Sequence, residues 1–322
     1  MANILDERKR VLVKISTMYY IEGYSQQEIT DRLGISRSQI SRMLAEARDA
    51  GIVQITVHDP FSDETKYEKI LSQAFGLKEV VIVDASQSVS VNIPIGNAAA
   101  GLLERLIKDN CAIGINAGNS LSYISSAARH SDKKNLRVVP LVGGWGPSGA
   151  KWQANLSSRV LAENLGCKYL QLNAPAFVSN KEIRDALLGE NEISYVLSEA
   201  QKISIALVGI GQISPDSTLM KTGFLTEENI CELKEKGAVA NICNSFIAED
   251  GSHIQFSAYE NMIGLTIEDV KHVPCIIGVA SGRDKIDAIH ASLKGKYLDY
   301  LVTDLETARL IAEKYLEAQN DL

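Results

Sequence analysis

Apolar side chains recur at helical spacing along the first part of the chain. Val11, Ile15, Met18 and Tyr19 follow one another at intervals of one to four residues, and the stretch that holds them ends at Gly23. This spacing predicts a first helix of about four turns with one buried face. Two shorter stretches of the same kind follow it along the chain.

Each of the two shorter stretches begins with a serine that is followed three residues later by Glu or Gln. Ser25 precedes Glu28, and Ser36 precedes Gln39. This is the capping-box pattern, in which the serine hydroxyl accepts the backbone N–H of the Glu or Gln and that side chain accepts the backbone N–H of the serine. Gly34, between the two stretches, can take the positive φ that ends a helix. The residues that we expect these two helices to bury are Ile29, Leu33, Ile40, Met43, Leu44 and Ala47.

Two short helices joined by a tight glycine turn are typical of a helix-turn-helix, in which the start of the second helix enters the major groove of DNA. Arginine can pair with guanine and glutamine with adenine, while serine contacts phosphates or base edges. A helical hairpin with solvated arginines is the alternative. The residues predicted to contact DNA are Ser25, Gln26, Gln27, Ser36, Arg37, Ser38, Gln39, Ser41 and Arg42.

The stretch after the third helix alternates apolar and polar residues. Val53, Ile55 and Val57 alternate with Gln54 and Thr56, which predicts a half-buried strand that could form a wing. Asp59-Pro60 interrupts the pattern. We therefore expect a winged helix-turn-helix domain at 1–58 and a linker at 59–66.

Beyond the linker, short apolar runs rich in β-branched residues alternate with amphipathic stretches. This alternation is typical of a parallel sheet covered by helices. The expected strands are 80–84, 112–116, 136–142, 169–172, 203–211, 273–280 and 299–304, and the expected helices include 98–106, 160–165, 286–293 and 308–316. The predicted fold class is α/β, with a small all-α winged helix-turn-helix domain followed by a larger doubly wound, mostly parallel α/β effector domain at 67–322.

Several of the expected strands end in small polar loops, and ligands of such sheets bind beyond the carboxyl ends of the strands. Asn119 or Ser120 can cap the helix after 112–116, and its exposed N–H groups could hold a phosphate. A glycine after a strand can also be a simple turn, and Lys285 can be a solvated helix charge. The residues predicted to bind a small-molecule effector are Gly118, Asn119, Ser120, Gly143, Gly144, Gly211, Gln212, Asn241 and Lys285.

Composition narrows the class of protein. The formal net charge is −7, and it is divided unevenly: residues 1–57 hold 8 Lys/Arg and 7 Asp/Glu (8 − 7 = +1), and the rest hold 25 and 33 (25 − 33 = −8). The less acidic N-terminal part is therefore the candidate for DNA contact.

No run approaches the roughly 18 apolar residues of a membrane span, and the charged N-terminus does not suit a signal peptide. We expect a cytoplasmic protein without a membrane partner.

The five cysteines are scattered and form no C-x-x-C, and the five histidines lack the spacing of metal ligands. We therefore expect neither a disulfide framework nor a metal site, and no cofactor.

The whole chain resembles the SorC family of sugar-responsive bacterial transcriptional regulators. The resemblance implies a winged helix-turn-helix followed by an effector domain like ribose-5-phosphate isomerase and glucosamine-6-phosphate deaminase. It also implies phosphorylated-sugar effectors, operator DNA and assembly into tetramers. The stretches on which it rests are "YYIEGYSQQEITDRLGISRSQISRMLAEARDAGIVQI", "IGINAGNSL", "VVPLVGG", "ALVGIG", "GAVANICNSFIAEDG", "GVASGRDKIDAIHASLKGKYLDYLVTD" and "ETARLI".

The resemblance also assigns roles to single positions. The stretch 118–120 stands where the family has a Gly-Thr-Thr-like phosphate loop, and Lys285 stands where a family lysine meets the ligand. Val142 replaces a residue that is basic in some phosphosugar-binding members, and Asn241 replaces a usual Asp or Glu. The less charged pocket argues against a doubly phosphorylated ligand and against a Schiff base there. A singly phosphorylated sugar or a neutral polyol stays open.

Three functions compete. The first is a DNA-binding regulator switched by a sugar phosphate or polyol, and the second is a sugar-phosphate isomerase or deaminase on the same scaffold. The third is a scaffolding protein that uses its helices for oligomerisation. An enzyme needs a positioned carboxylate base; Asp250 and Asp284 are available, but Asn241 lacks a carboxylate. Scaffolding leaves the glycine loops unexplained. We therefore favour the regulator and expect no catalytic residue.

Overall fold

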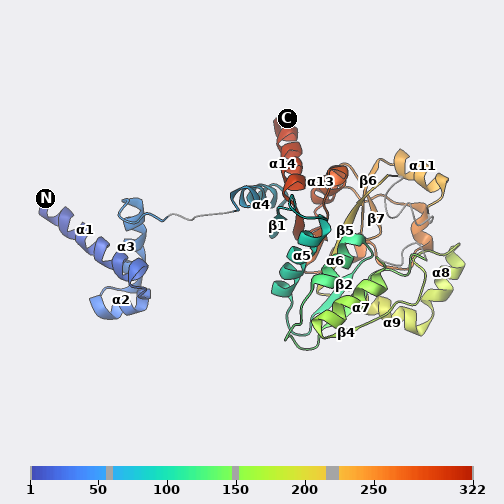
Figure 1. Ribbon diagram of the computed structural model, residues 1–322, viewed down its shortest axis with the longest axis horizontal. Coiled ribbons are helices and arrows are strands. Elements are labelled where there is room, and N and C mark those ends of the chain that lie inside the picture. Colours follow the sequence, from blue (N-terminus) through green and yellow to red (C-terminus); the bar gives the residue numbers. More distant parts are fainter. Residues whose placement is uncertain (1, 56–60, 147–151, 215–224, 321–322) are drawn as a thin grey trace. The chain divides into compact units, whose positions relative to one another are not determined.

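The computed structural model describes residues 2–55, 61–146, 152–214 and 225–320. The chain forms two compact units, Met1–Pro60 and Phe61–Leu322 (Figure 1). No helix in these described ranges is both long and apolar enough to cross a membrane.

The first unit is a bundle of helices. Helix α1 (Ala2–Ser16) continues into one π-helical segment, η1 (Thr17–Ile21), and is followed by α2 (Gln26–Leu33) and α3 (Arg37–Asp49). Both predicted capping boxes are present, and Gly34 ends α2 in the left-handed conformation. The buried residues that hold this unit together are Ile15, Met18, Ile29, Ile40 and Leu44. The predicted helix-turn-helix is confirmed.

The predicted wing is not formed by the described residues of the first unit. Residues 51–55 form a turn and an irregular segment, and Ile55 is 61% exposed. The N–H groups of Ile52 and Val53 bond back to the carbonyl of Ala47 at the end of α3, at 2.9 and 3.1 Å. A strand needs a neighbouring strand to pair with, and none lies among the described residues of this unit. The rest of the expected strand, at 56–57, lies outside the described residues.

A parallel sheet forms the centre of the second unit. Its strands follow the order β1-β9-β8-β5-β2-β3-β4, and all neighbours in this order are parallel. The predicted parallel sheet is confirmed. The strands are β1 (Glu79–Val83), β2 (Ala112–Ile115), β3 (Arg137–Pro140), β4 (Lys168–Tyr169), β5 (Ile205–Gln212), β8 (Ile276–Val279) and β9 (Tyr300–Asp304).

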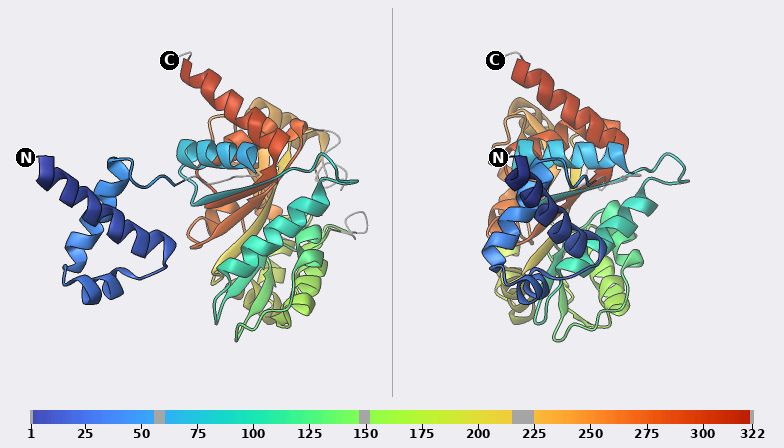
Figure 2. Two further views of the ribbon diagram at one scale, coloured as in Figure 1. Left: turned by 60° about the vertical axis from the view of Figure 1, so that its left-hand side comes forward. Right: turned by 90° about the vertical axis from the view of Figure 1, so that its left-hand side faces the viewer.

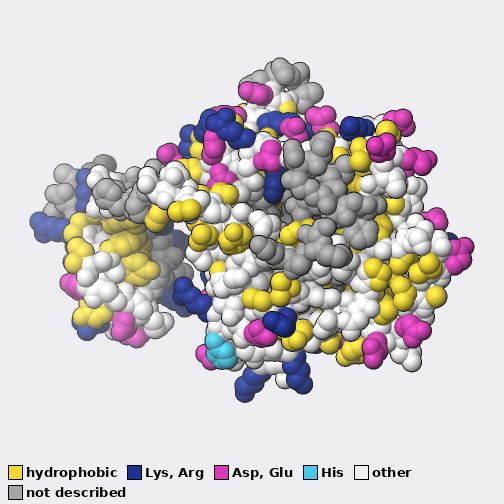
Figure 3. Space-filling view, turned by 45° about the vertical axis from the view of Figure 1, so that its right-hand side comes forward, with side chains coloured by type: hydrophobic (Ala, Val, Ile, Leu, Met, Phe, Trp, Pro, Cys, Tyr) yellow, Lys and Arg dark blue, Asp and Glu magenta, His cyan; other side chains and the backbone are white. Residues whose placement is uncertain are grey.

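Helices pack on both faces of this sheet, as expected for a doubly wound fold (Figure 2). One face is covered by α5 (Asn92–Leu106), α6 (Asn119–Ala127) and α7 (Ala154–Leu165). The other is covered by α4 (Ser62–Phe75), α9 (Asn191–Ala200), α13 (Ile286–Lys294) and α14 (Leu305–Asn320). The remaining helical segments among the described residues of this unit are α8 (Lys181–Leu188), α11 (Glu227–Glu235), α12 (Ile267–Val270), η3 (Ser257–Asn261) and η4 (Arg283–Lys285). Acidic and basic side chains are scattered over the face shown in Figure 3.

Helix α4 changes the boundary expected from the sequence. It begins at Ser62 and contacts both β1 and α14, so residues 62–66 of the expected linker are helical and belong to the second unit. Its end at Gly76 has the positive φ of a helix C-terminus, 71°. The boundary between the two units lies between Pro60 and Phe61.

An antiparallel hairpin extends the sheet and was not predicted. Strands β6 (Ala238–Ile242) and β7 (Ser245–Ala248) are joined by Cys243 and Asn244, which have φ values of 45° and 61°. Two adjacent residues with positive φ are the mark of a tight hairpin turn. Strand β6 pairs with the end of β5, where Asn241 lies opposite Gly211. The hairpin thereby brings Asn241 to the carboxyl end of the parallel sheet.

Candidate functional site

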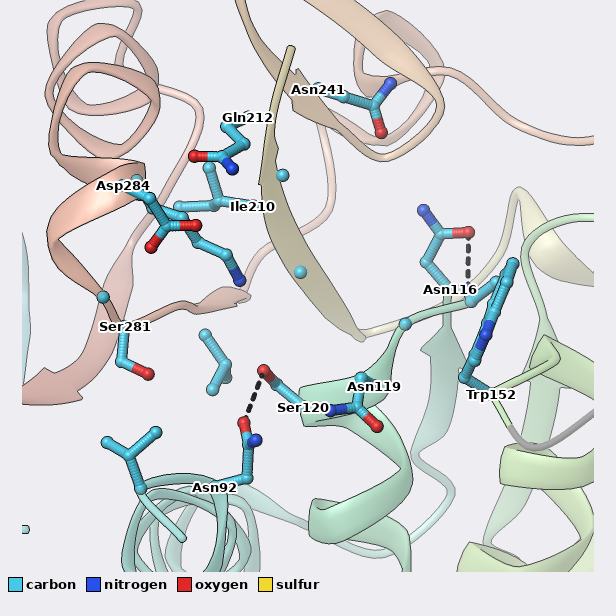
Figure 4. A pocket seen from close by; sticks show the side chains of 18 of the residues that line it. Asn92, Asn116, Asn119, Ser120, Trp152, Ile210, Gln212, Asn241, Ser281 and Asp284 are labelled. Atoms are coloured by element: carbon cyan, nitrogen blue, oxygen red, sulfur yellow. Dashed lines mark hydrogen bonds between the residues drawn. The ribbon is translucent and has the colours of Figure 1, made fainter. Parts of the chain in front are cut away.

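Three neighbouring strands end at one cavity (Figure 4). Strand β2 lies beside β5 and β5 beside β8, so their carboxyl ends meet although the chain visits them far apart. The cavity has a volume of about 440 Å³, which is usual for a small-molecule site. The described residues that line it are Val91, Asn92, Asn116, Ala117, Gly118, Asn119, Ser120, Trp145, Trp152, Gly209, Ile210, Gly211, Gln212, Asn241, Asn244, Val279, Ser281, Gly282, Asp284 and Lys285.

Most of the residues predicted to bind an effector lie together in this cavity. Those that line it are Gly118, Asn119, Ser120, Gly211, Gln212, Asn241 and Lys285. They come from four different parts of the sheet edge. The structure shows that these residues lie close together, as predicted, whereas their role in binding remains a prediction.

Gly143 and Gly144 do not line the cavity, contrary to expectation. A Cβ atom on Gly143 would lie 2.5 Å from the carbonyl oxygen of Ala174, and the Gly144 N–H donates to the same carbonyl at 2.8 Å. The missing side chain of Gly143 allows these two backbone segments to pack closely. Trp145, which directly follows Gly144, does line the cavity.

The start of α6 faces the cavity. Gly118 is its N-cap and provides no side-chain cap, so neither Asn119 nor Ser120 plays the capping role expected from the sequence. The Ser120 hydroxyl donates to Oδ1 of Asn92 at 3.4 Å (Figure 4). The first N–H groups of a helix have no partner within the helix. Together with the helix dipole, they suit an anionic group of a ligand.

Lys285 is the basic residue among the described residues that line the cavity. It is the last residue of η4 and the N-cap of α13, which is slightly before the first-turn position expected from the sequence. Burial lowers the pKa of the Lys285 ammonium, and the neighbouring Asp284 carboxylate opposes this shift. Lys285 and Asp284 are the charged residues among the described lining, so its formal net charge is zero.

Side-chain amides dominate the rest of the polar lining. Several are held by the backbone: Asn116 accepts from the Ala117 N–H at 2.8 Å, and Asn244 donates to the Leu265 carbonyl at 2.9 Å. Asn241 donates to the Ser245 carbonyl at 3.3 Å. Fixed amides can both donate to and accept from hydroxyl groups. The lining residues that the sequence reasoning missed include Asn92, Asn116, Asn244, Trp145 and Trp152. Asn116 ends a predicted strand, which was a usable signal.

The residues predicted to contact DNA lie at the N-caps and in the first two turns of α2 and α3. Some of them already have partners within the protein. The Gln27 amide donates to Asp31 at 2.9 Å, and the Gln39 side chain accepts from the Ser36 N–H at 3.3 Å. These side chains would have to exchange a bond within the protein for one with DNA.

Other side chains of α3 are available for contact. Arg37, Ser41 and Arg42 are exposed, and neither arginine forms a hydrogen bond or an ion pair with another residue in the described part of the chain. Ser38 is also exposed and lies 3.2 Å from the Ser36 hydroxyl. Exposed arginines without protein partners near the start of α3, the second helix of the helix-turn-helix, are well suited to contact bases in the major groove.

A helix-turn-helix unit followed by a doubly wound unit with a polar cavity defines a class of DNA-binding proteins that carry a small-molecule domain. Comparison with known families agrees. The family described as "Putative sugar-binding domain" matches residues 59–313, and "Sigma-70, region 4" matches residues 4–50. The chain belongs to the SorC family of sugar-binding transcriptional regulators, which confirms the resemblance found in the sequence.

Similar proteins align over nearly their whole length. The transcriptional regulator LsrR of Enterobacter sp. (strain 638) is 29% identical over 307 residues, covering 94% of this chain and 93% of that protein. The deoxyribonucleoside regulator of Bacillus subtilis is 28% identical, covering 95% and 98%. The crystal structure of the full-length sorbitol operon regulator SorC from Klebsiella pneumoniae has a TM-score of 0.74 and 26% identity, covering 94% and 98%.

Proposed function

We propose that this protein regulates transcription of genes of carbohydrate metabolism and that a sugar phosphate or polyol changes its affinity for double-stranded operator DNA. One observation carries the proposal: a single chain combines exposed, unpaired arginines at the start of α3 with a polar cavity at the strand ends. The relatives named above support it: they are a transcriptional regulator, a deoxyribonucleoside regulator and a sorbitol operon regulator. DNA is the partner, and we place the protein in the cytoplasm, where that DNA is found.

The effector that best suits the cavity has at most one phosphate. The N-terminus of α6 and Lys285 can together hold one anionic group, while Asp284 repels a second one nearby. The amide side chains of the lining suit hydroxyl groups. A singly phosphorylated sugar fits this arrangement, and a neutral polyol is the second candidate because Lys285 and Asp284 balance in charge.

We also propose that the protein is not an enzyme. Isomerases and deaminases of sugar phosphates need a carboxylate base beside the substrate. Of the two carboxylates weighed from the sequence, Asp284 lines the cavity and Asp250 does not. The Asp250 carboxylate accepts from the N–H and the hydroxyl of Ser252, and these bonds lower its pKa. Asn241 also lines the cavity, at a position where the family usually has Asp or Glu, and an amide cannot act as a base.

The proposal is tested by a thermal-shift screen with phosphorylated sugars and polyols, because a ligand of the native state raises the melting temperature. Calorimetry then compares wild type with Lys285→Ala. Hydrogen bonds to charged groups contribute about 1.5–3 kcal/mol, so the variant should bind a phosphorylated effector about tenfold to a hundredfold more weakly. DNA binding without effector should be unchanged.

Arg283→Ala is the matched control for that experiment. Arg283 lies two residues away on the same 3-10 helix, but its guanidinium pairs with Glu306 at 2.8 Å and it does not line the cavity. This variant should bind the effector as wild type does. Equal effector affinities of Lys285→Ala and wild type would remove Lys285 from the site and favour an uncharged polyol.

A further inference from the structure

Both tryptophans of the chain line the cavity. The sequence contains two, Trp145 and Trp152, and both belong to the lining. Trp145 is 4% exposed and packs between Trp152 and Phe177, with ring centroids 6.5 and 5.7 Å away. Trp152 is half-buried, and its side chain lines the cavity (Figure 4). The two tryptophans therefore form an aromatic wall on one side of the cavity.

Two contacts position Trp152 beside the start of α6. Its backbone carbonyl accepts the Gly118 N–H at 2.9 Å, which ties it to the N-cap of α6. The Trp145 ring supports it from the protein interior. In Figure 4, Trp152 stands beside Asn116, on the opposite side of the cavity from Asp284 and Ser281. A ligand anchored at the start of α6 would therefore meet the Trp152 ring at one end.

We propose that Trp152 is a stacking platform and that the cavity selects a cyclic sugar over an open-chain polyol. The face of an aromatic ring is electron-rich and attracts the slightly positive C–H groups on one face of a sugar ring. An open chain offers no such flat face and must also lose more rotational freedom on binding. The surrounding amides of Asn116 and Asn119 are placed to bind ring hydroxyls. This inference rests on the proposed function and specifies its effector.

The test uses two pairs of probes that share carbon number and phosphate and differ in ring closure. They are glucose 6-phosphate with sorbitol 6-phosphate, and ribose 5-phosphate with ribitol 5-phosphate. Dissociation constants are measured by calorimetry on the full chain, for wild type, Trp152→Leu and Trp152→Phe. In the tighter-binding pair, the cyclic member should bind wild type about tenfold more tightly. Trp152→Leu should reduce this ratio to near one, whereas Trp152→Phe, which keeps an aromatic face, should preserve most of it.

Tryptophan fluorescence gives a second readout. In Trp145→Phe, Trp152 is the one remaining tryptophan, and its emission should change with the cyclic probe more than with the open-chain probe. The inference is overturned if the open-chain member binds wild type as tightly, if Trp152→Leu weakens both members equally, or if no probe binds. Lys285→Ala separates the two proposals: an unchanged affinity there rejects the phosphate contact, while the ring preference of wild type is judged independently.

Discussion

At the scale of single residues, the two candidate surfaces differ in how their side chains are engaged. On α3, Gln39 is occupied by the capping box, whereas Arg37 and Arg42 have no partner among the described residues. In the cavity, the amides are held by backbone groups and Lys285 is partly desolvated. Sequence-specific contact with DNA should therefore depend on the arginines more than on the glutamine.

Arg42→Ala should weaken binding to the operator much more than binding to random DNA. Its side chain is exposed near the start of α3 and can reach a guanine, so the loss should be about 1–3 kcal/mol, at one base position. The measurement is a titration of wild type and variant with an operator selected from random sequences, at one salt concentration. An equal loss on both DNAs would mean that Arg42 contacts phosphate alone.

His290 should make the second unit sensitive to acid. It is 3% exposed, its ring packs edge-on against Phe75 at 5.7 Å, and burial lowers its pKa to about 4 from 6.5. As the pH falls below 6.5, His290 is protonated more readily in the unfolded chain than in the folded protein. The stability that the protein has above pH 6.5 with neutral His290 is therefore lost as the pH falls towards 4. Between pH 7 and pH 5 the free energy of unfolding should fall by about 2 kcal/mol from this group alone.

Urea unfolding at the two pH values measures this effect. The matched variant is His290→Leu, which is apolar and of similar size, and whose free energy of unfolding should depend less on pH by that amount. The same pH dependence in wild type and variant would assign the acid sensitivity to other groups.

At the scale of elements, the N-terminal unit depends on the ends of its helices. The hydroxyl of Ser25 accepts the Glu28 N–H, the hydroxyl of Ser36 accepts the Gln39 N–H, and Gly34 has a φ of 67° between the two helices. These local bonds satisfy N–H groups that the helices cannot satisfy themselves. They also set where α3 starts, and hence which side chains its first turn presents.

Ser36→Ala should destabilise the first unit by about 1 kcal/mol through loss of the cap of α3. Amide hydrogen exchange of α2 and α3 in the full chain would measure it, and the exchange of the second unit should not change. Ser41→Ala is the matched control, because Ser41 is exposed on the same helix and caps nothing. Comparable effects of the two substitutions would contradict a specific role of the cap.

At the scale of the whole molecule, the charge is divided between the two units. Residues 1–57 have a net charge of 8 − 7 = +1 and the rest has 25 − 33 = −8. A single DNA-binding unit with so little positive charge gains few phosphate contacts, and several units on one assembly gain more. The charge distribution therefore favours an oligomer as the form that binds DNA.

We expect a homotetramer, with contacts chiefly through the second unit. Two-fold symmetry in such an assembly should be matched by a palindromic or repeated operator. Light scattering at micromolar concentration, with and without DNA, measures the mass of the assembly. A monomer under both conditions would contradict this prediction.

The sequence by itself determined the features that depend on neighbours along the chain. Helix caps at Ser25 and Ser36, the turn at Gly34 and the apolar strands were all predictable, because three or four residues hold the necessary bonds and burial pattern. The described part of the expected wing, residues 53–55, is not a strand, and the reason is the converse one. The alternation at Val53 and Ile55 indicates a strand, but a strand also needs a partner that a local pattern cannot supply.

Only the tertiary structure decided which strand ends meet. Strand β5 separates β2 from β8, an order set by the crossover connections, and this brings Gly118, Gly211 and Lys285 to one cavity. Gly143 follows β3, which lies beyond β2, and its backbone packs against another loop instead. Asn92, at the start of α5, and Trp152, in the loop before α7, also line the cavity, but no pattern in the residues around them indicates this. Contacts between distant segments depend on the packing of the whole unit, and so they appear first in the fold.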